Sequence, residues 1–216
     1  MPNVKIRPFQ VADRSYVRAI CCDGADRGEP IERFFFDREI AADLLTCYYT
    51  DYEPASSFVA EHEGKVVGYI NGCLDNRRYG LVMFWILTPG VLIKAFKHGT
   101  FLNKIFWQML WGMMGNWPRL FAWRKQSFHS HQGHMHIGIA KEFRGQHLGR
   151  QLMEAFFTYA APHSPIEMTV SVHDGNIPAC RFFEHLGFTA TARYPMVMMY
   201  NGSLQHYHSI YYVKTI

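Results

Sequence analysis

The chain has 216 residues, of which 49% are apolar and 19% are charged, so it is long and apolar enough to bury a core and is not a disordered protein. Its net charge of +4 is too mild to indicate a nucleic-acid binder. The five cysteines are odd in number and lack metal-ligand spacing, and no apolar leader follows Met1. We therefore expect a cytoplasmic protein with no metal and with reduced, mostly buried thiols at Cys21, Cys22, Cys47, Cys73 and Cys180.

The first third of the chain predicts a strand, two helices and a hairpin. Residues 4–8 alternate in polarity and end at a proline, which predicts a short strand. Asp13 and Asp37 stand where they could cap helices that run to about Cys22 and about Tyr48. The apolar stretches 57–61 and 66–70 flank a turn that contains a glycine, and this pattern is typical of a β-hairpin.

Residues 76–133 differ in composition from the rest of the chain. From Asn76 to His134 there is no Asp or Glu, whereas eight Lys or Arg and all five Trp fall there. This shift predicts an inserted module within the domain. Three interpretations stay open: a helical cap packed against the domain or a second subunit, a substrate lid, and a patch that contacts a membrane surface.

Within this insertion, residues 81–87 form an apolar run that we expect to end at Thr88-Pro89-Gly90. Apolar residues from Leu102 to Met113 then keep the rhythm of an amphipathic helix. Because no window of about 18 residues is apolar without interruption, we expect no membrane-spanning helix.

The last third alternates strands and helices. We expect strands at 134–140, 166–172, 188–194 and 210–213, and helices that begin near Leu148 and Asn176. Gly187 is well placed to close the second of these helices with a left-handed residue. The pattern indicates the α/β class, with a mixed sheet that has helices on both faces.

The stretch from His136 to Arg150 predicts an anion site. An apolar strand leads into a loop with Gly145 and Gly149, which opens into a helix. The first backbone N–H groups of a helix have no partner within the helix and lie at the positive end of its dipole, so they suit a phosphate group. Arg144 and Arg150 add positive charge beside them.

Two blocks of the sequence resemble the cofactor half of the GNAT superfamily of N-acetyltransferases. The first block follows the family pattern of Arg or Gln, two residues, Gly, one residue, and Gly or Ala, here from Arg144 to Gly149. The second runs from Asn176 through Ala179 and an aromatic pair to Gly187-Phe188. The resemblance covers residues 3–75 and 133–200 and implies one domain over 1–216 with the GNAT acyl-CoA N-acyltransferase fold, interrupted by 76–133.

This resemblance implies direct transfer of an acetyl group from acetyl-CoA to a primary amine on a small molecule or a peptide. In that family the pantetheine pairs with the fourth strand, which opens away from the fifth, and the loop and following helix hold the phosphates. The cofactor-binding residues implied here are Ile137, Gly138, Ile139, Arg144, Gly145, Gln146, His147, Leu148, Gly149, Arg150, Asn176 and Phe183.

The chain departs from the family pattern at two positions. His147 replaces the central glycine, and we expect it to keep a negative φ and to weaken or reshape the cofactor contact. Phe183 replaces a tyrosine that protonates the departing thiolate in many members, so another donor, a water or no donor is needed. The replacement donors considered are Tyr194, Tyr200 and Tyr207.

A protonated amine cannot attack a thioester, so a base is needed, and an imidazole suits that role. We rank His136 first as the catalytic base, followed by His134 and His173, and the carboxylate of Glu142 is also near. Strand alternation puts His134 and His136 on the face opposite Met135, and the sequence does not say which of the two faces is accessible to solvent.

A different class of function stays open: a catalytically weak or inactive GNAT-like module that binds acyl-CoA or a protein partner. A membrane-peripheral acetyltransferase is a third alternative, and a homodimer is also open. Because the insertion is basic, it disfavours polyamines and favours an acidic or apolar acceptor. Nucleic acid is not an expected partner, since the basic residues are separated by long apolar runs.

Overall fold

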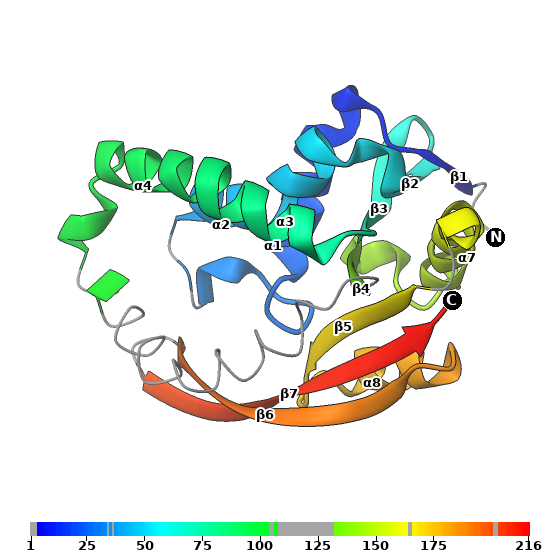
Figure 1. The fold of residues 1–216 in the computed structure, drawn as a ribbon. Helices are drawn as coiled ribbons and strands as arrows, with labels where there is room; N and C mark the ends of the chain where they lie inside the picture. The colour runs from blue at the N-terminus through cyan, green and yellow to red at the C-terminus, as the bar shows by residue number, and fades with distance from the viewer. Residues whose placement is uncertain are drawn as a thin grey trace.

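A computed structural model describes residues 4–33, 35, 37–103, 106–107, 132–163, 166–200 and 203–216 (Figure 1). Its seven strands form one sheet in the order β1-β2-β3-β4-β5-β7-β6. All neighbouring strands are antiparallel except β4 and β5, which are parallel, so the predicted mixed sheet is confirmed. The strands are β1 (Val4–Pro8), β2 (Ser57–His62), β3 (Lys65–Cys73), β4 (Gln132–Ile139), β5 (Glu167–His173), β6 (Thr189–Tyr200) and β7 (Ser203–Thr215).

Helices cover both faces of the sheet, as the sequence predicts. On one face, α7 (Leu148–Ala160) and α8 (Ile177–His185) build the main core, in which Leu152 and Phe156 of α7 are fully buried. On the other face lie α1 (Arg14–Gly24) and α2 (Arg38–Cys47). Alternation along each strand sends successive side chains to these two layers.

The two predicted helix caps differ. The Asp37 carboxylate accepts a hydrogen bond from the backbone N–H of Ile40 at 3.1 Å, as the sequence predicts. Asp13 makes no such bond to α1, so that prediction is wrong. Its carboxylate is instead occupied by the Arg7 guanidinium at 2.7 Å, and this ion pair ties β1 to the start of α1.

The chain leaves β3 at Cys73 and returns to its neighbour β4 at Gln132. Between them, α3 (Asn76–Val82), a π-helical turn (Met83–Leu87) and α4 (Thr88–Lys97) form one continuous helix. The expected end at Thr88-Pro89-Gly90 is therefore wrong. The wide turn falls just before Pro89, and the Thr88 hydroxyl donates to the carbonyl of Met83 at 2.7 Å, so the helix passes a residue that has no N–H. The predicted helix from Leu102 to Met113 lies largely outside the described residues.

The helix from Asn76 to Lys97 is long and apolar enough to cross a membrane, by length and composition alone. The helix has 22 residues, its most apolar window of 18 residues has a mean hydropathy of 1.6, and 6% of that window is buried. Lys94 and Lys97 fall in the last turn and leave the centre of the helix uncharged. Length and composition alone do not establish a span, so the expectation that no helix spans a membrane stays a prediction.

Candidate active site

β4 and β5 diverge and open a cleft in the middle of the sheet. They pair only from Gln132 to His134, opposite Glu167 to Thr169. Beyond His134, β4 stays paired with β3 as far as Ile139, but its other edge pairs with no strand among the described residues. Unpaired backbone N–H and C=O groups along this edge can bind a ligand that carries amides. A cavity of about 1600 Å³ lies along the cleft.

The loop before α7 presents unpartnered backbone donors to the same cavity. α7 begins at Leu148 with no side-chain cap and no acidic residue in its first turn. Within the described residues, the N–H groups of residues 145–150 donate to no carbonyl. Gly145 has a φ of +76°, and there is open space where a Cβ would stand. A free helix N-terminus with room for close approach fits a diphosphate.

His147 adopts the left-handed conformation, with a φ of +61°. The expectation of a negative φ is wrong, because the turn into α7 uses the left-handed residue that a glycine normally supplies. The side chain is exposed, so it clashes with nothing, and the strain is of the order of 1 kcal/mol.

The two arginines of the loop have different partners. Arg144 donates from Nε to the Ile139 carbonyl at 3.0 Å and from Nη1 to the Gly28 carbonyl at 2.9 Å. A Cβ at Gly28 would stand 2.7 Å from that guanidinium. Arg144 thus holds the loop after α1 against β4, whereas Arg150 is exposed and, in the described part of the chain, forms an ion pair with Glu154 alone, at 2.8 Å. Arg150 is the freer of the two charges.

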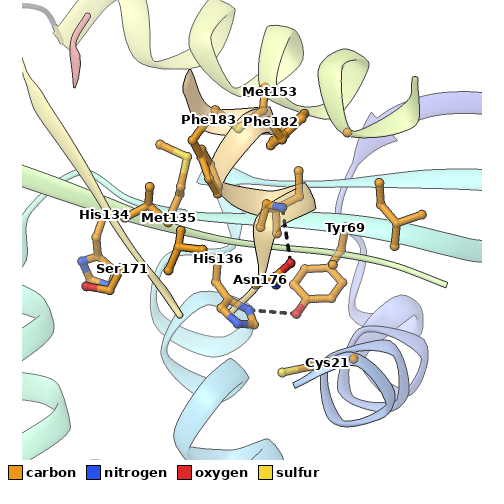
Figure 2. A pocket seen from close by; sticks show the side chains of 18 of the residues that line it. Cys21, Tyr69, His134, Met135, His136, Met153, Ser171, Asn176, Phe182 and Phe183 are labelled. Atoms are coloured by element: carbon orange, nitrogen blue, oxygen red, sulfur yellow. Dashed lines mark hydrogen bonds between the residues drawn. The ribbon is translucent and has the colours of Figure 1, made fainter. Parts of the chain in front are cut away.

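The structure identifies which face of β4 each side chain occupies. Met135 packs into the core beneath α7, whereas His134 and His136 point to the opposite face (Figure 2). His136 points toward α1, and His134 points toward Tyr49 and Asn76. Gly138 lies on the histidine face, where a Cβ would stand 2.6 Å from Cε1 of Tyr69. The missing side chain at Gly138 is what lets the Tyr69 ring lie beside His136.

His136 is held at one nitrogen and open at the other. Its Nδ1 lies 2.8 Å from the Tyr69 hydroxyl (Figure 2). The Tyr69 hydroxyl also interacts with the thiol of Cys21 on α1. Within the described part of the chain, Nε2 of His136 has no hydrogen-bond partner. Burial lowers the pKa of His136 to about 4, so the imidazole is neutral at pH 7.

His134 also lines the cavity, but both of its nitrogens are occupied. Nδ1 lies against Oδ1 of Asn76, and Nε2 lies 2.7 Å from the Tyr49 hydroxyl. An amide oxygen only accepts, so Nδ1 carries the hydrogen and Nε2 accepts from Tyr49. Burial, with a smaller contribution from His136, lowers the pKa of His134 to about 4. This histidine is neutral and has no free lone pair.

His173, at the end of β5, carries its hydrogen on Nε2, whereas His134 carries it on Nδ1. Nδ1 accepts the backbone N–H of Gly175 at 2.8 Å, so in the neutral ring Nε2 carries the hydrogen. The ring stacks on Tyr207, with centroids 4.2 Å apart. Burial lowers the pKa of His173, which favours the neutral form. In this tautomer His173 can donate a hydrogen bond but cannot accept a proton.

The second sequence block lies along the cavity beside α8. The Asn176 side chain caps α8 by accepting the N–H of Ala179 at 3.3 Å (Figure 2). Phe183 is 3% exposed, and its ring contacts Phe182 and Phe188 edge-on with centroids 5.1 and 5.4 Å apart. Phe183 therefore contributes carbon surface to the lining and has no proton to give.

The remaining candidates lie away from the cavity lining or offer no donor there. Glu142 is exposed in a short turn before the loop. Tyr194 is outside the lining, and the Tyr200 side chain lies outside the described part of the chain. Burial raises the pKa of Tyr207, whose ring covers His173.

Sequence reasoning missed Tyr69, Cys21 and Tyr211. Gly138, a glycine in the middle of a strand, is a signal of close approach that could have led to Tyr69.

Tyr211 of β7 pairs with Ser171 of β5, and both line the cavity. The Tyr211 hydroxyl is buried and has no hydrogen-bond partner among the described residues. A buried hydroxyl without a partner beside a cavity is free to bind a ligand.

The charges around the cavity are mostly positive. Its lining includes Arg27, Arg150 and Lys214, and Glu154 is its one carboxylate among the described residues. Tyr79, Met83 and Phe84 of the inserted helix also line the cavity, and the Tyr79 ring packs edge-on against His134. In the part of the chain that the structure describes, no group of three or more metal-ligating side chains is found, and all five thiols are free and buried.

Comparison with known proteins supports the resemblance. Residues 105–188 match the model of the acetyltransferase (GNAT) family. No curated protein matches the chain.

Solved structures share the whole fold. SsHAT superposes with a TM-score of 0.71 at 22% identity, covering 99% of this chain and 98% of that one. A polyamine N-acetyltransferase from Drosophila melanogaster gives 0.59 at 16% identity, covering 99% and 100%. The putative acetyltransferase yncA from Salmonella typhimurium, solved with acetyl-CoA, gives 0.59 at 15% identity, covering 98% and 93%. The expected GNAT fold is confirmed.

Proposed function

This chain is a GNAT-fold protein, and we propose that it transfers an acetyl group from acetyl-CoA to a primary amine by direct attack. The observation that carries this proposal is the open edge of β4, which leads to the unpartnered N–H groups at the start of α7. These two features suit the amide-bearing arm and the diphosphate of one ligand.

The residues present fit acetyl-CoA. The backbone of Ile137, Gly138 and Ile139 would hold the pantetheine, and residues 145–150 would hold the diphosphate. Arg150 adds charge at the helix start, whereas Arg144 fixes the shape of the loop. When bound, acetyl-CoA supplies an acetyl group activated as a thioester.

His136 is the proposed base, because Nε2 is its open nitrogen. For Nε2 to accept the amine proton, Nδ1 must carry a hydrogen and donate it to the Tyr69 hydroxyl. Tyr69 then directs its own hydrogen to the sulfur of Cys21. With a pKa lowered to about 4, His136 is neutral at pH 7 and its Nε2 lone pair is available, although the same shift makes it a weaker base than a free imidazole.

Tyr211 is the proposed donor to the departing thiolate. Phe183 cannot fill this role, and the Tyr211 hydroxyl is a buried O–H group on the cavity wall with no partner in the described residues. It lies on the same face of the sheet as Ser171 and His173, since these strands pair in register.

The acceptor class follows from the cavity charges. An amine is cationic until it loses its proton, and the part of the inserted helix that lines the cavity offers Tyr79, Met83 and Phe84 but no carboxylate. Arg27 stands nearby in the same lining. We therefore expect an amine on an apolar or anionic molecule rather than a polyamine.

The test is thiol release from acetyl-CoA by the full chain with a panel of apolar, anionic and polyamine acceptors. We expect turnover with one of the first two groups, and a His136→Gln loss of kcat of about 10²–10⁴. The control is His163→Gln, an exposed histidine outside the cavity lining, which should leave kcat unchanged.

The rival function, an acyl-CoA-binding module without activity, is favoured by Phe183 and by the strained His147. Binding of acetyl-CoA with no thiol release across the panel would establish that alternative and overturn the transferase proposal.

A further inference from the structure

The helix from Asn76 to Lys97 carries a large exposed apolar surface. Of the twelve large apolar side chains that are exposed in the described chain, seven lie on this helix. Trp85 is 70% exposed and Phe96 is 78% exposed. Contiguous exposed apolar surface of this kind marks an interaction site. We call the following residues the apolar face: Leu81, Phe84, Trp85, Leu92, Ile93 and Phe96.

The spacing of these residues puts them on one side of the helix. Leu81, Trp85, Leu92 and Phe96 follow one another at intervals of four, seven and four residues. The other side packs into the domain, where Leu87 and its neighbours contact the buried Tyr48 and Tyr49. The helix runs along the outside of α1 and α2 (Figure 1), so the apolar face points away from the domain.

Polar contacts fix the helix along the domain. Lys94 forms an ion pair with Asp43 of α2 at 2.6 Å, and His98 lies 2.9 Å from the carboxylate of Asp37. A helix that spanned a bilayer would carry Lys94, Asp43 and the adjoining charged groups of the domain into hydrocarbon, which is costly. Because one side of this helix is held against charged groups of the domain, it can lie on a membrane surface but cannot cross it in this fold.

Positive charge flanks the apolar face at both ends. Arg77 and Arg78 are exposed at the start of the helix, and Lys97 is exposed at its end. No Asp or Glu occurs between Asn76 and His134, so nothing on this segment neutralises these charges. Aromatic and aliphatic side chains flanked by cations match the boundary of acyl chains and anionic headgroups.

We propose that the apolar face binds the surface of an anionic membrane, with the helix lying in the membrane plane. A second copy of the chain fits this face less well, because pairing two such helices brings Arg77, Arg78 and Lys97 of both copies together without acidic partners. Phe84 belongs to the apolar face and also lines the cavity, so a docked chain has its cavity beside the headgroups.

The test is co-sedimentation of the full chain with vesicles of phosphatidylcholine alone or with about one third phosphatidylglycerol, a composition in the range that carries strong surface charge. We expect binding to the anionic vesicles, little binding to the neutral ones, and weakening by salt. The double variant Trp85→Ser/Phe96→Ser should bind at least tenfold more weakly. Neither residue lines the cavity, so acetyl-CoA binding should be unchanged in this variant.

The matched control is Val11→Ser, which removes a side chain that is 81% exposed on another part of the molecule and should not change vesicle binding. Equal binding of the double variant and the wild-type chain overturns the proposal, as does equal binding to both kinds of vesicle. A wild-type dimer in light scattering that the double variant converts to a monomer, without an effect of lipid, assigns the face to a second copy instead. These outcomes do not depend on the proposed transferase activity.

Discussion

The Tyr69 hydroxyl lies 2.8 Å from Nδ1 of His136, and this contact decides which nitrogen of His136 can take a proton. Tyr69 is fully buried, and burial raises the pKa of its hydroxyl well above the ordinary value, so it stays protonated. The hydroxyl has one hydrogen to give. If that hydrogen goes to Cys21, Tyr69 accepts from Nδ1 and leaves Nε2 free.

Replacement of Tyr69 by phenylalanine removes the hydroxyl that fixes the tautomer of His136 and keeps the ring that covers Gly138. We expect Tyr69→Phe to lower kcat about tenfold, the order of effect of losing one positioning hydrogen bond, with an unchanged KM for acetyl-CoA. Steady-state kinetics with both substrates measure this split. An equal rise in the KM for acetyl-CoA would contradict a role for Tyr69 in positioning His136 alone.

Cys21 is predicted to act through Tyr69. Cys21→Ser keeps an acceptor for the Tyr69 hydrogen and should retain most of kcat, whereas Cys21→Ala should resemble Tyr69→Phe. The control is Cys22→Ala, because this neighbouring buried thiol donates to the carbonyl of Arg38 and lies outside the cavity lining. Equal kcat values for the serine and alanine variants at Cys21 would show that Cys21 does not act through Tyr69.

The buried histidines make stability depend on pH. Burial lowers the pKa of His134 and His136 from 6.5 to about 4, so below pH 6.5 the unfolded chain binds more protons than the folded one. The free energy of unfolding should be highest above pH 6.5 and fall toward pH 4, by at most about 3 kcal/mol for each histidine.

Urea unfolding at pH 7.5, 6 and 5 measures this dependence, and the variant His134→Gln isolates one contribution. Acidic groups in ion pairs also make the fold less stable as the pH falls. Asp43 is an example: burial raises the pKa of its carboxyl, but Lys94 and Arg18 outweigh burial and lower it. The comparison is therefore between variant and wild type. The same slope in both proteins would show that His134 is not held neutral by the fold.

A side chain at Gly138 should disturb the cleft from both sides. A Cβ there would stand 2.6 Å from the Tyr69 ring, so either Tyr69 or β4 must move. We expect Gly138→Ala to lower kcat and to weaken acetyl-CoA binding at least tenfold. Gly90→Ala is the control, because nothing lies within 4 Å of its added Cβ. Calorimetry and kinetics on both variants check this prediction, and normal values for Gly138→Ala would contradict it.

Position 147 tests the loop directly. His147→Gly removes a side chain from a left-handed residue and should stabilise the fold by about 0.5–1 kcal/mol. It should also tighten acetyl-CoA binding, because the backbone donors become more accessible. His147→Val should destabilise, since a β-branched residue is poorly tolerated at positive φ. Thermal unfolding of the wild type and the two variants gives their order of stability. A glycine variant less stable than the wild type would contradict the prediction.

The sequence was sufficient to predict the elements that carry local patterns. Alternation in residues 57–70 and the glycines of the loop before α7 indicate β2, β3 and the anion site directly. The order of strands and helices indicates a mixed sheet, and two short blocks indicate the GNAT fold. These features depend on residues that are near one another in the chain.

Features that depend on long-range packing could not be predicted in this way. The contact of Tyr69 with His136 joins residues 67 positions apart and depends on the register of β3 with β4. The tautomer of His134 is set by Asn76 and Tyr49, which come from the inserted helix and from the π-helical turn that follows α2. The helix continues through Pro89 because a π-helical turn precedes it, and no periodic pattern reports such a turn.

The account depends most on the cleft between β4 and β5, where the open strand edge meets the unpartnered N–H groups of residues 145–150. Isothermal titration of the full chain with acetyl-CoA tests it most directly. The account predicts saturable binding at one site per chain, with a dissociation constant in the micromolar range. No heat of binding with millimolar acetyl-CoA would contradict it.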